Sequence, residues 1–386
     1  MLTSSIDFVN FKLNKKNLII KKKLIFLLKK KNEIIKSLCK NYTDSFNKKK
    51  LNKYKKYSDF RIIGMGGSTL GTQAIYDFLI HKIKKNFIFT DNLQTNSTKD
   101  KKKFTNLVVS KSGNTIETIV NANIFIKRKD KNIFITENKN SYLFNLAEKL
   151  KSDIIHHNNF IGGRYSVLSE VGMLPAELMG LKTSNFRQLN DLIKNKRFIN
   201  SLISNVSSTL YFIKKKKFNS IIINYDERSK NLFNWYQQLI AESLGKKKKG
   251  LLPIVSTMPK DNHSTMQLYL DGFKNNFFTF FYVNEKNSKK INNSTILSSQ
   301  NYLKNKNLSK ITLAQKKATE NVFRNKKIPF RSFEIKKRDE KTLGELFCFF
   351  ILETILIGQS MNLNPYDQPA VELIKIETKK LLTKNT

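Results

Sequence analysis

The residues Leu107-Val-Val-Ser-Lys-Ser-Gly-Asn-Thr-Ile-Glu-Thr118 decide the fold class. An apolar, strand-like run ends at Ser110, a turn rich in hydroxyl groups follows, and a helical pattern continues to about Lys127. Arg61–Gly64 shows the same order, since it precedes a glycine turn and a helical stretch over 69–83. Further strand-like runs lie at 86–90 and 132–136. Strands that alternate with helices are typical of a parallel sheet with helices on both faces.

A second set of alternating runs begins near residue 190. Its strand-like members are Ser220–Asn224, Leu251–Ser256 and Phe277–Val283. The polar stretch 284–310 predicts an exposed loop, and helices are expected over 343–362 and 371–382. The predicted fold class is α/β with two doubly wound parallel-sheet domains. The predicted divisions are a basic helical segment over 1–54, domains over 55–188 and 189–340, and C-terminal helices over 341–386.

The charge of the chain is its most unusual bulk property. The 386 residues carry a formal net charge of +41, and 62 of the 71 basic residues are Lys against 9 Arg. Nucleic-acid binding is one interpretation. However, base and phosphate recognition favours the forked guanidinium of Arg, and Lys and Asn have AT-rich codons. We therefore interpret the charge mainly as codon bias expressed in solvated lysines, and expect no nucleic-acid partner.

Other bulk features point to a soluble protein of a reducing compartment. Two cysteines, Cys39 and Cys348, exclude a disulfide framework and a Cys-rich metal site. The longest apolar run near the N-terminus, 24–28, is shorter than a secretory signal core. The apolar run 346–357 is shorter than the roughly 20 residues that span a bilayer. We expect a cytoplasmic protein that binds no membrane.

Three turns carry residues suited to anion binding. Gly64-Met-Gly-Gly-Ser-Thr-Leu-Gly71 lets the backbone approach a ligand, although a purely structural turn is equally consistent with it. The turn Ser110–Thr118 places four hydroxyl groups where a helix begins, which favours a phosphate cradle over simple capping. Gly162-Gly-Arg-Tyr-Ser166 keeps an Arg in a Lys-rich chain, which indicates a need for its planar fork or a structural ion pair.

Three later segments contain candidate acid, base and amide groups. Glu242 lies in Ala241-Glu-Ser-Leu-Gly245, near the end of a predicted helix. His263 lies in a segment with Asp261 and Gln267, and a structural His is the alternative. Asn364-Pro-Tyr-Asp-Gln-Pro-Ala-Val-Glu-Leu-Ile-Lys375 is a proline-bounded turn before a helix, where Asp367 is a candidate cap.

These six segments, in this order, resemble the glucose-6-phosphate isomerase family over roughly 58–380. The resemblance implies two sugar-isomerase (SIS) domains, an isomerisation of glucose 6-phosphate and fructose 6-phosphate without cofactor or metal, and a homodimer with the active site near the subunit interface. Ser112, Gly113, Tyr366 and Ala370 depart from common family residues, and the chain is short for the family.

The resemblance also implies residue roles. Glu242 matches the base that moves a proton between C1 and C2, and Arg164 matches the group that stabilises the cis-enediolate. His263, from the neighbouring subunit, and Lys375 match the pair that assists ring opening, and Glu117 matches a carboxylate associated with the His. The remaining matches are a phosphate loop of Ser110, Ser112, Thr115 and Thr118, and substrate-lining positions Gly67, Ser68 and Gln368.

Two rival functions remain at this point. A non-catalytic sugar-phosphate sensor would keep the hydroxyl loop but would not need Glu242, Arg164, His263 and Lys375 together. An isomerase that also accepts mannose 6-phosphate differs only in stereochemistry at C2, which the sequence does not distinguish.

Overall fold

The computed structural model describes residues 1–13, 17–94 and 102–384 and contains two five-stranded sheets. The first has the strand order β3-β2-β4-β5-β6 and is parallel throughout. The second has the order β1-β10-β9-β7-β8. The strands are β1 (Ile6–Val9), β2 (Asp59–Gly64), β3 (Asn86–Thr90), β4 (Thr105–Val109), β5 (Lys131–Thr136), β6 (Asp153–His156), β7 (Asn219–Asn224), β8 (Leu252–Thr257), β9 (Asn276–Val283) and β10 (Phe330–Ile335).

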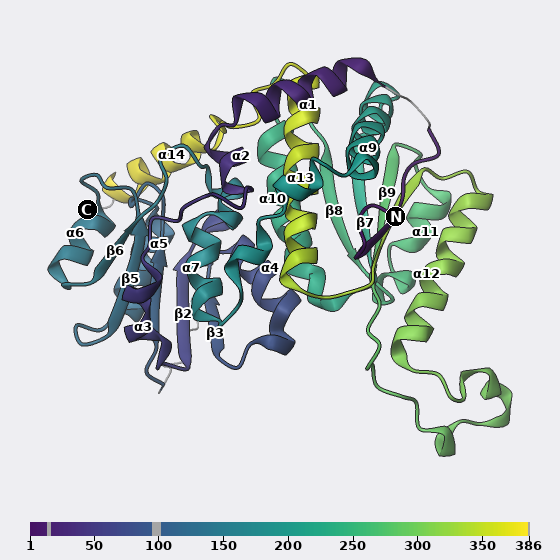
Figure 1. Ribbon diagram of the computed structural model, residues 1–386, viewed down its shortest axis with the longest axis horizontal. Helices are drawn as coiled ribbons and strands as arrows, with labels where there is room; N and C mark the ends of the chain where they lie inside the picture. Colours follow the sequence, from purple (N-terminus) through teal and green to yellow (C-terminus); the bar gives the residue numbers. More distant parts are fainter. Residues whose placement is uncertain (14–16, 95–101, 385–386) are drawn as a thin grey trace.

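Helices cover both sheets and fill the space between them (Figure 1). The α-helices are α1 (Leu18–Lys30), α2 (Glu33–Ser37), α3 (Lys48–Lys55), α4 (Leu70–Leu79), α5 (Ile116–Phe125), α6 (Tyr142–Lys149), α7 (Glu170–Leu178), α8 (Leu189–Leu192), α9 (Lys196–Lys214), α10 (Lys230–Leu244), α11 (Met266–Asp271), α12 (Leu308–Asn325), α13 (Glu340–Ser360) and α14 (Val371–Lys384). Helices α4, α10 and α13 pack on one another between the two sheets. The predicted α/β class with two parallel-sheet units is confirmed.

Both sheets follow the same topological plan. In the first sheet, β2 is internal, β3 lies on one side of it, and β4 and β5 lie on the other. In the second sheet, apart from β1 at its edge, β7 is internal, β8 lies on one side, and β9 and β10 lie on the other. The chain therefore changes direction across the sheet between β2 and β4, and between β7 and β9. Ligands of open α/β sheets bind at such points, beyond the carboxyl ends of the strands. In the first sheet, the glycine turn follows β2 and the hydroxyl-rich turn follows β4.

The N-terminal segment differs from the sequence prediction in one respect. It is helical over α1 to α3, but residues Ile6–Val9 form strand β1, which pairs antiparallel with β10. The second sheet is therefore not wholly parallel. Antiparallel pairing with a strand from the far end of the chain depends on tertiary contacts, and no local pattern of residues specifies it.

Helix α13 is the centre of the second unit. It is the one helix of the described residues that is long and apolar enough to span a membrane, and 94% of its most apolar window is buried inside the fold. The packing of α13 is close at Gly344, because a Cβ there would lie 2.0 Å from the carbonyl oxygen of Phe186. The expected buried helix is therefore present, over Glu340–Ser360.

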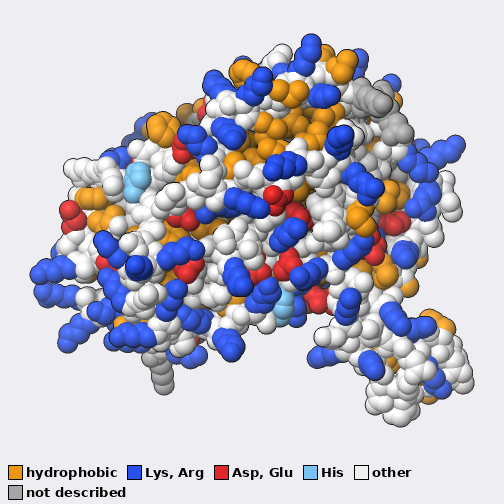
Figure 2. Space-filling model, viewed as in Figure 1, with side chains coloured by type: hydrophobic (Ala, Val, Ile, Leu, Met, Phe, Trp, Pro, Cys, Tyr) orange, Lys and Arg blue, Asp and Glu red, His pale blue; other side chains and the backbone are white. Residues whose placement is uncertain are grey.

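The polar stretch predicted as a loop is exposed, with two short 3-10 turns at Asn293–Thr295 and Ser298–Leu303 before α12 begins at Leu308. Lys and Arg side chains are spread over the visible face of the molecule and do not form a single patch on it (Figure 2). That distribution agrees with solvated lysines on this face.

Candidate active site

Two glycine-rich turns meet at the carboxyl edge of the first sheet. Gly66–Ser68 forms a short 3-10 turn after β2, and Gly163–Leu168 forms another after β6. A Cβ on Gly67 would lie 2.2 Å from the carbonyl carbon of Gly163 and 2.5 Å from the amide nitrogen of Arg164. Only glycine allows this approach, so the predicted substrate-lining residue Gly67 also fixes the backbone of the Arg164 turn.

Arg164 lies at the centre of the site and is 1% exposed. Its Nε donates to Ser243 Oγ at 2.8 Å. One terminal nitrogen, Nη1, donates to Glu242 Oε2 at 3.0 Å and to Gln368 Oε1 at 2.6 Å. The other, Nη2, donates to the carbonyl oxygens of Pro365 at 2.8 Å and Asp367 at 3.1 Å. These contacts use all five N–H groups of a guanidinium, so Arg164 joins three segments that are distant in sequence.

The contacts of Arg164 continue into a hydrogen-bonded chain. Ser243 Oγ lies 2.9 Å from the hydroxyl of Tyr165, and that hydroxyl donates to the carbonyl oxygen of Pro365 at 2.9 Å. Because burial raises the pKa of Tyr165 to about 12, its phenol keeps the proton that it donates. Trp235 Nε1 donates to the carbonyl oxygen of Arg164 at 3.0 Å. Helix α10 therefore supports both the backbone and the guanidinium of Arg164.

The carboxylate of Glu242 is held from two sides. In addition to the Arg164 contact, Oε1 accepts a hydrogen bond from Gln238 Nε2 at 2.8 Å. Gln238 is one turn earlier on α10, and residues four apart share a helix face. The Glu242 side chain is 29% exposed, whereas that of Arg164 is completely covered. The carboxylate is thus oriented by protein donors but still reachable from solvent, as a base acting on a bound ligand requires.

The hydroxyl-rich turn forms a second part of the site. Ser110 Oγ lies 3.0 Å from Thr115 Oγ1, and Ser112 is exposed with its Oγ accepting from the amide of Asn114 at 3.3 Å. Helix α5 begins at Ile116, directly behind this turn. The hydroxyl of Thr118 is buried without a hydrogen-bond partner in the described part of the chain. Together, amide groups at a helix N-terminus and an unpaired hydroxyl suit a bound anion.

The two turns are neighbours, because β2 pairs with β4. A Cβ on Gly64, which ends β2, would lie 2.8 Å from the carbonyl oxygen of Val109, which ends β4. Ser68 is half-buried at the end of its turn, and Glu117 is half-buried in the first turn of α5. The structure therefore places the predicted phosphate loop beside the turn that contacts Arg164.

Two predicted site residues, His263 and Lys375, lie away from the group around Arg164 and Glu242. Helix α10 runs back between the parallel strands β7 and β8, so Glu242 lies near the edge where the strands of the second sheet begin. His263 follows β8 at the opposite edge. A strand of this length spans about 20 Å. The side chain of His263 is exposed. Lys375 is exposed on α14, where Nζ contacts Glu372 Oε1 at 2.6 Å.

Comparison with known proteins decides the family. Residues 22–386 match the family Phosphoglucose isomerase. The chain belongs to this family. The glucose-6-phosphate isomerase of Methanocaldococcus jannaschii is 34% identical over 366 residues, with 86% of each chain covered. That of Mycoplasmopsis pulmonis is 31% identical over 355 residues, covering 84% of this chain and 82% of the relative. The phosphoglucose isomerases are isomerase enzymes, so the predicted enzyme class is confirmed.

Solved structures of low sequence identity share the fold. A hypothetical protein from Thermus thermophilus aligns with a TM-score of 0.83 at 22% identity, and the alignment covers 95% of this chain and 94% of that protein. A glucose-6-phosphate isomerase from Chlamydia trachomatis aligns with a TM-score of 0.72 at 17% identity and covers 99% of this chain and 89% of its own. The arrangement of two parallel-sheet units is therefore that of the phosphoglucose isomerase fold.

Three residues of this candidate site were missed by sequence reasoning. Gln238 contacts the carboxylate of Glu242, and Ser243 and Tyr165 contact Arg164 or each other. Helical spacing of four from Glu242 was a signal for Gln238. Ser243 and Tyr165 each adjoin a predicted site residue in the sequence, but only the fold shows that their hydroxyl groups meet.

Proposed function

We propose that the protein interconverts glucose 6-phosphate and fructose 6-phosphate through a cis-enediolate. The observation that carries this proposal is the group formed by Arg164, Glu242 and Gln368 beside the hydroxyl-rich turn. Glu242 is the base that removes the proton from one of the two carbons C1 and C2 and returns it to the other. A single carboxylate performs both steps, because the proton stays on it between them.

Arg164 stabilises the negative charge that develops on the enediolate. A buried guanidinium is a fixed cation that keeps its proton, and it acts in surroundings of low dielectric constant. Since its five N–H groups already have partners, we infer that it acts on the substrate through its charge, and through Nη1 when Gln368 exchanges its contact for a substrate oxygen. Its contact with Glu242 also fixes the direction in which the base faces.

The phosphate group of the substrate binds at Ser110, Ser112, Thr115 and Thr118. The unpaired buried hydroxyl of Thr118 and the N-terminus of α5 support this placement. Gly67, Ser68 and Gln368 line the path between the phosphate and Glu242, and Glu117 is a supporting carboxylate. No cofactor or metal is needed for a proton transfer of this kind.

We propose a homodimer in which His263 of one subunit completes the site of the other. His263 is exposed and lies at the far edge of the second sheet from Glu242 of the same chain. A second copy of the chain can supply His263 to this site while the sheet of each subunit stays intact. His263 and Lys375 then assist opening of the sugar ring, and Lys375 reaches the site if α14 swings about the segment after Gln368. The reaction belongs to glycolysis and gluconeogenesis, and we infer a cytoplasmic enzyme.

The direct test is an assay of the wild-type protein with fructose 6-phosphate, coupled to oxidation of glucose 6-phosphate, beside a parallel assay with mannose 6-phosphate. We expect turnover of fructose 6-phosphate. Turnover of both substrates would identify a bifunctional isomerase. Binding of sugar phosphates with no turnover of either one would show a non-catalytic sensor and refute the proposal.

A further inference from the structure

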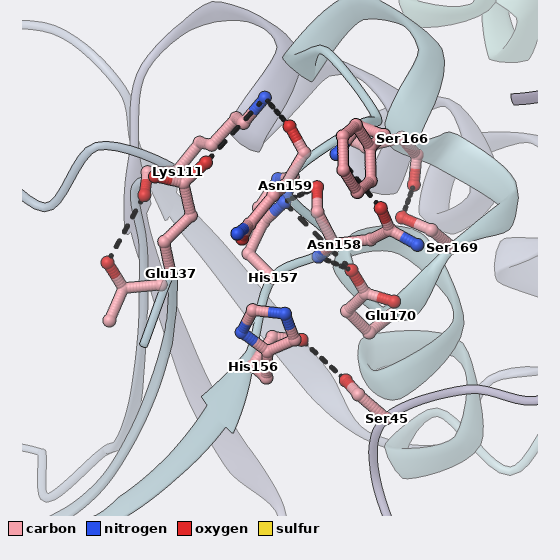
Figure 3. Close-up of polar contacts among 12 residues, drawn as sticks. Ser45, Lys111, Glu137, His156, His157, Asn158, Asn159, Ser166, Ser169 and Glu170 are labelled. Atoms are coloured by element: carbon pink, nitrogen blue, oxygen red, sulfur yellow. Dashed lines mark hydrogen bonds and ion pairs between the residues drawn. The ribbon is translucent and has the colours of Figure 1, made fainter. Parts of the chain in front are cut away.

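Lys111 lies in the hydroxyl-rich turn, and its side chain extends to the backbone of Asn159 (Figure 3). Its ammonium group donates to the carbonyl oxygen of Asn159 at 2.6 Å and lies 3.7 Å from Glu137 Oε1. The side chain is 33% exposed, and burial is the main cause that lowers the pKa of Lys111. This lysine therefore connects the turn after β4 to the loop after β6.

The end of β5 holds the backbones of both segments. The amide of Glu137 donates to the carbonyl oxygen of Lys111 at 3.1 Å, and the amide of His157 donates to the carbonyl oxygen of Thr136 at 2.8 Å. Because β5 fixes the backbone of Lys111 independently, the side chain is not needed to keep this turn in place. The side chain instead acts on the loop that contains Asn159, through the hydrogen bond of its ammonium group.

That loop leads directly to the turn of Arg164. Asn159 precedes Gly162 by three residues, and Gly163 is the residue that Gly67 contacts. On its other side the loop is held by Glu170, whose Oε1 accepts from the amide of Asn158 at 2.6 Å (Figure 3). Lys111 and Glu170 thus hold two peptide groups of the loop, one on each side of the peptide that joins Asn158 to Asn159.

We propose that Lys111 is a positioning residue that fixes the distance between the phosphate-binding turn and the turn of Arg164. This inference rests on the proposed isomerisation. The phosphate anchors one end of the substrate and the reacting carbons lie at the other, near Glu242 and Arg164. An error of about 1 Å between two such groups lowers the rate of a positioned reaction by up to about a hundredfold.

The test compares Lys111→Met with Lys139→Met. Lys139 also pairs with Glu137, but it is exposed and lies outside the hydroxyl-rich turn. We expect Lys111→Met to lower kcat about tenfold while the inhibition constant of inorganic phosphate changes less than about twofold. Lys111→Arg, which keeps a cationic donor, recovers most of kcat, and Lys139→Met behaves as the wild type.

Two results would overturn the inference. In the first, the inhibition constant of inorganic phosphate for Lys111→Met rises by the same factor by which kcat/KM falls. Lys111 is then a phosphate ligand and not a positioning residue. If kcat matches that of Lys139→Met, the contact with Asn159 has no functional role. Should Lys111→Met fail to fold, Lys111→Gln replaces it with the same expected result. Absence of turnover in the wild type would refute the proposed function itself, and that outcome is visible before any variant is compared.

Discussion

Arg164 and Glu242 form the part of the site where single side chains matter most. One is fully buried and the other is partly exposed, and a 3.0 Å contact joins them. The buried cation orients the carboxylate, while the exposed side of the carboxylate remains available to a ligand. This difference in exposure fits the roles proposed above, in which Arg164 positions the base and stabilises charge and Glu242 transfers the proton.

Replacing Glu242 with Gln removes the proposed base and keeps the shape of the side chain. The amide oxygen still accepts from Arg164, so the fold should persist. Since general-base catalysis contributes about 10²–10⁴ to a rate, we expect kcat to fall at least a hundredfold. The coupled fructose 6-phosphate assay measures this, and circular dichroism checks the fold. Near-wild-type turnover would show that another group is the base.

The burial of His157 predicts that the protein loses stability in acid. It is buried, and burial is the main cause that lowers its pKa from 6.5 to about 4. The unfolded chain therefore binds more protons than the folded chain between these values, and the free energy of unfolding falls as the pH drops through this window. We expect the wild type to lose about 2 kcal/mol more than His157→Gln between pH 7 and pH 5. Urea unfolding at both pH values measures the difference, and equal losses would contradict it.

At the level of elements, α10 is the scaffold of the site. It carries Trp235, Gln238, Glu242 and Ser243, and all four contact one another or the turn of Arg164. Its middle is held by a buried ionic group. Tyr236 donates to Glu353 Oε2 at 3.2 Å and accepts from Arg331 Nη2 at 3.1 Å. Helices α10 and α13 and strand β10 are joined by these contacts, so α10 is fixed to the core of the second unit.

Removing one partner of this buried ionic group should be costly. Arg331 and Glu353 are each 1% exposed and form an ion pair. Arg331→Met leaves a buried carboxylate without its cation, so we expect the free energy of unfolding to fall by about 3–5 kcal/mol. The double variant Arg331→Met, Glu353→Leu removes both charges and should recover part of the loss. Denaturant unfolding compares the three proteins, and a single variant as stable as the wild type would contradict the argument.

For the whole molecule, the proposed homodimer can be tested through His263. If His263 acts in the neighbouring subunit, each site combines Glu242 of one subunit with His263 of the other. Glu242→Gln and His263→Ala then remove different members of this pair. A mixed dimer of the two variants then contains one site with both wild-type residues. After the variants are unfolded together and refolded, random pairing should restore about a quarter of the wild-type activity. Each variant refolded alone is the control, and no recovery on mixing would place His263 outside the neighbouring site.

The sequence by itself determined much of this protein. Alternating strand and helix patterns predicted the two parallel-sheet units, because burial on both faces and short turns are local properties of each strand. The turns that contain Gly67, Arg164 and Ser110, and the helix with Glu242, were also recognisable from their residues. They follow strands or end helices, and their chemistry is carried by short, continuous segments.

Only the tertiary structure decided which of these segments meet. The pairing of β1 with β10 and the contacts of Arg164 with Ser243, Glu242 and Gln368 join residues that are 78 to more than 300 positions apart. The same holds for Lys111, whose side chain binds a loop 48 residues away. Local sequence specifies what each segment is, whereas buried packing between layers specifies which segment is its neighbour. The separation of His263 from Glu242 within one chain likewise follows from the direction of α10 across the sheet.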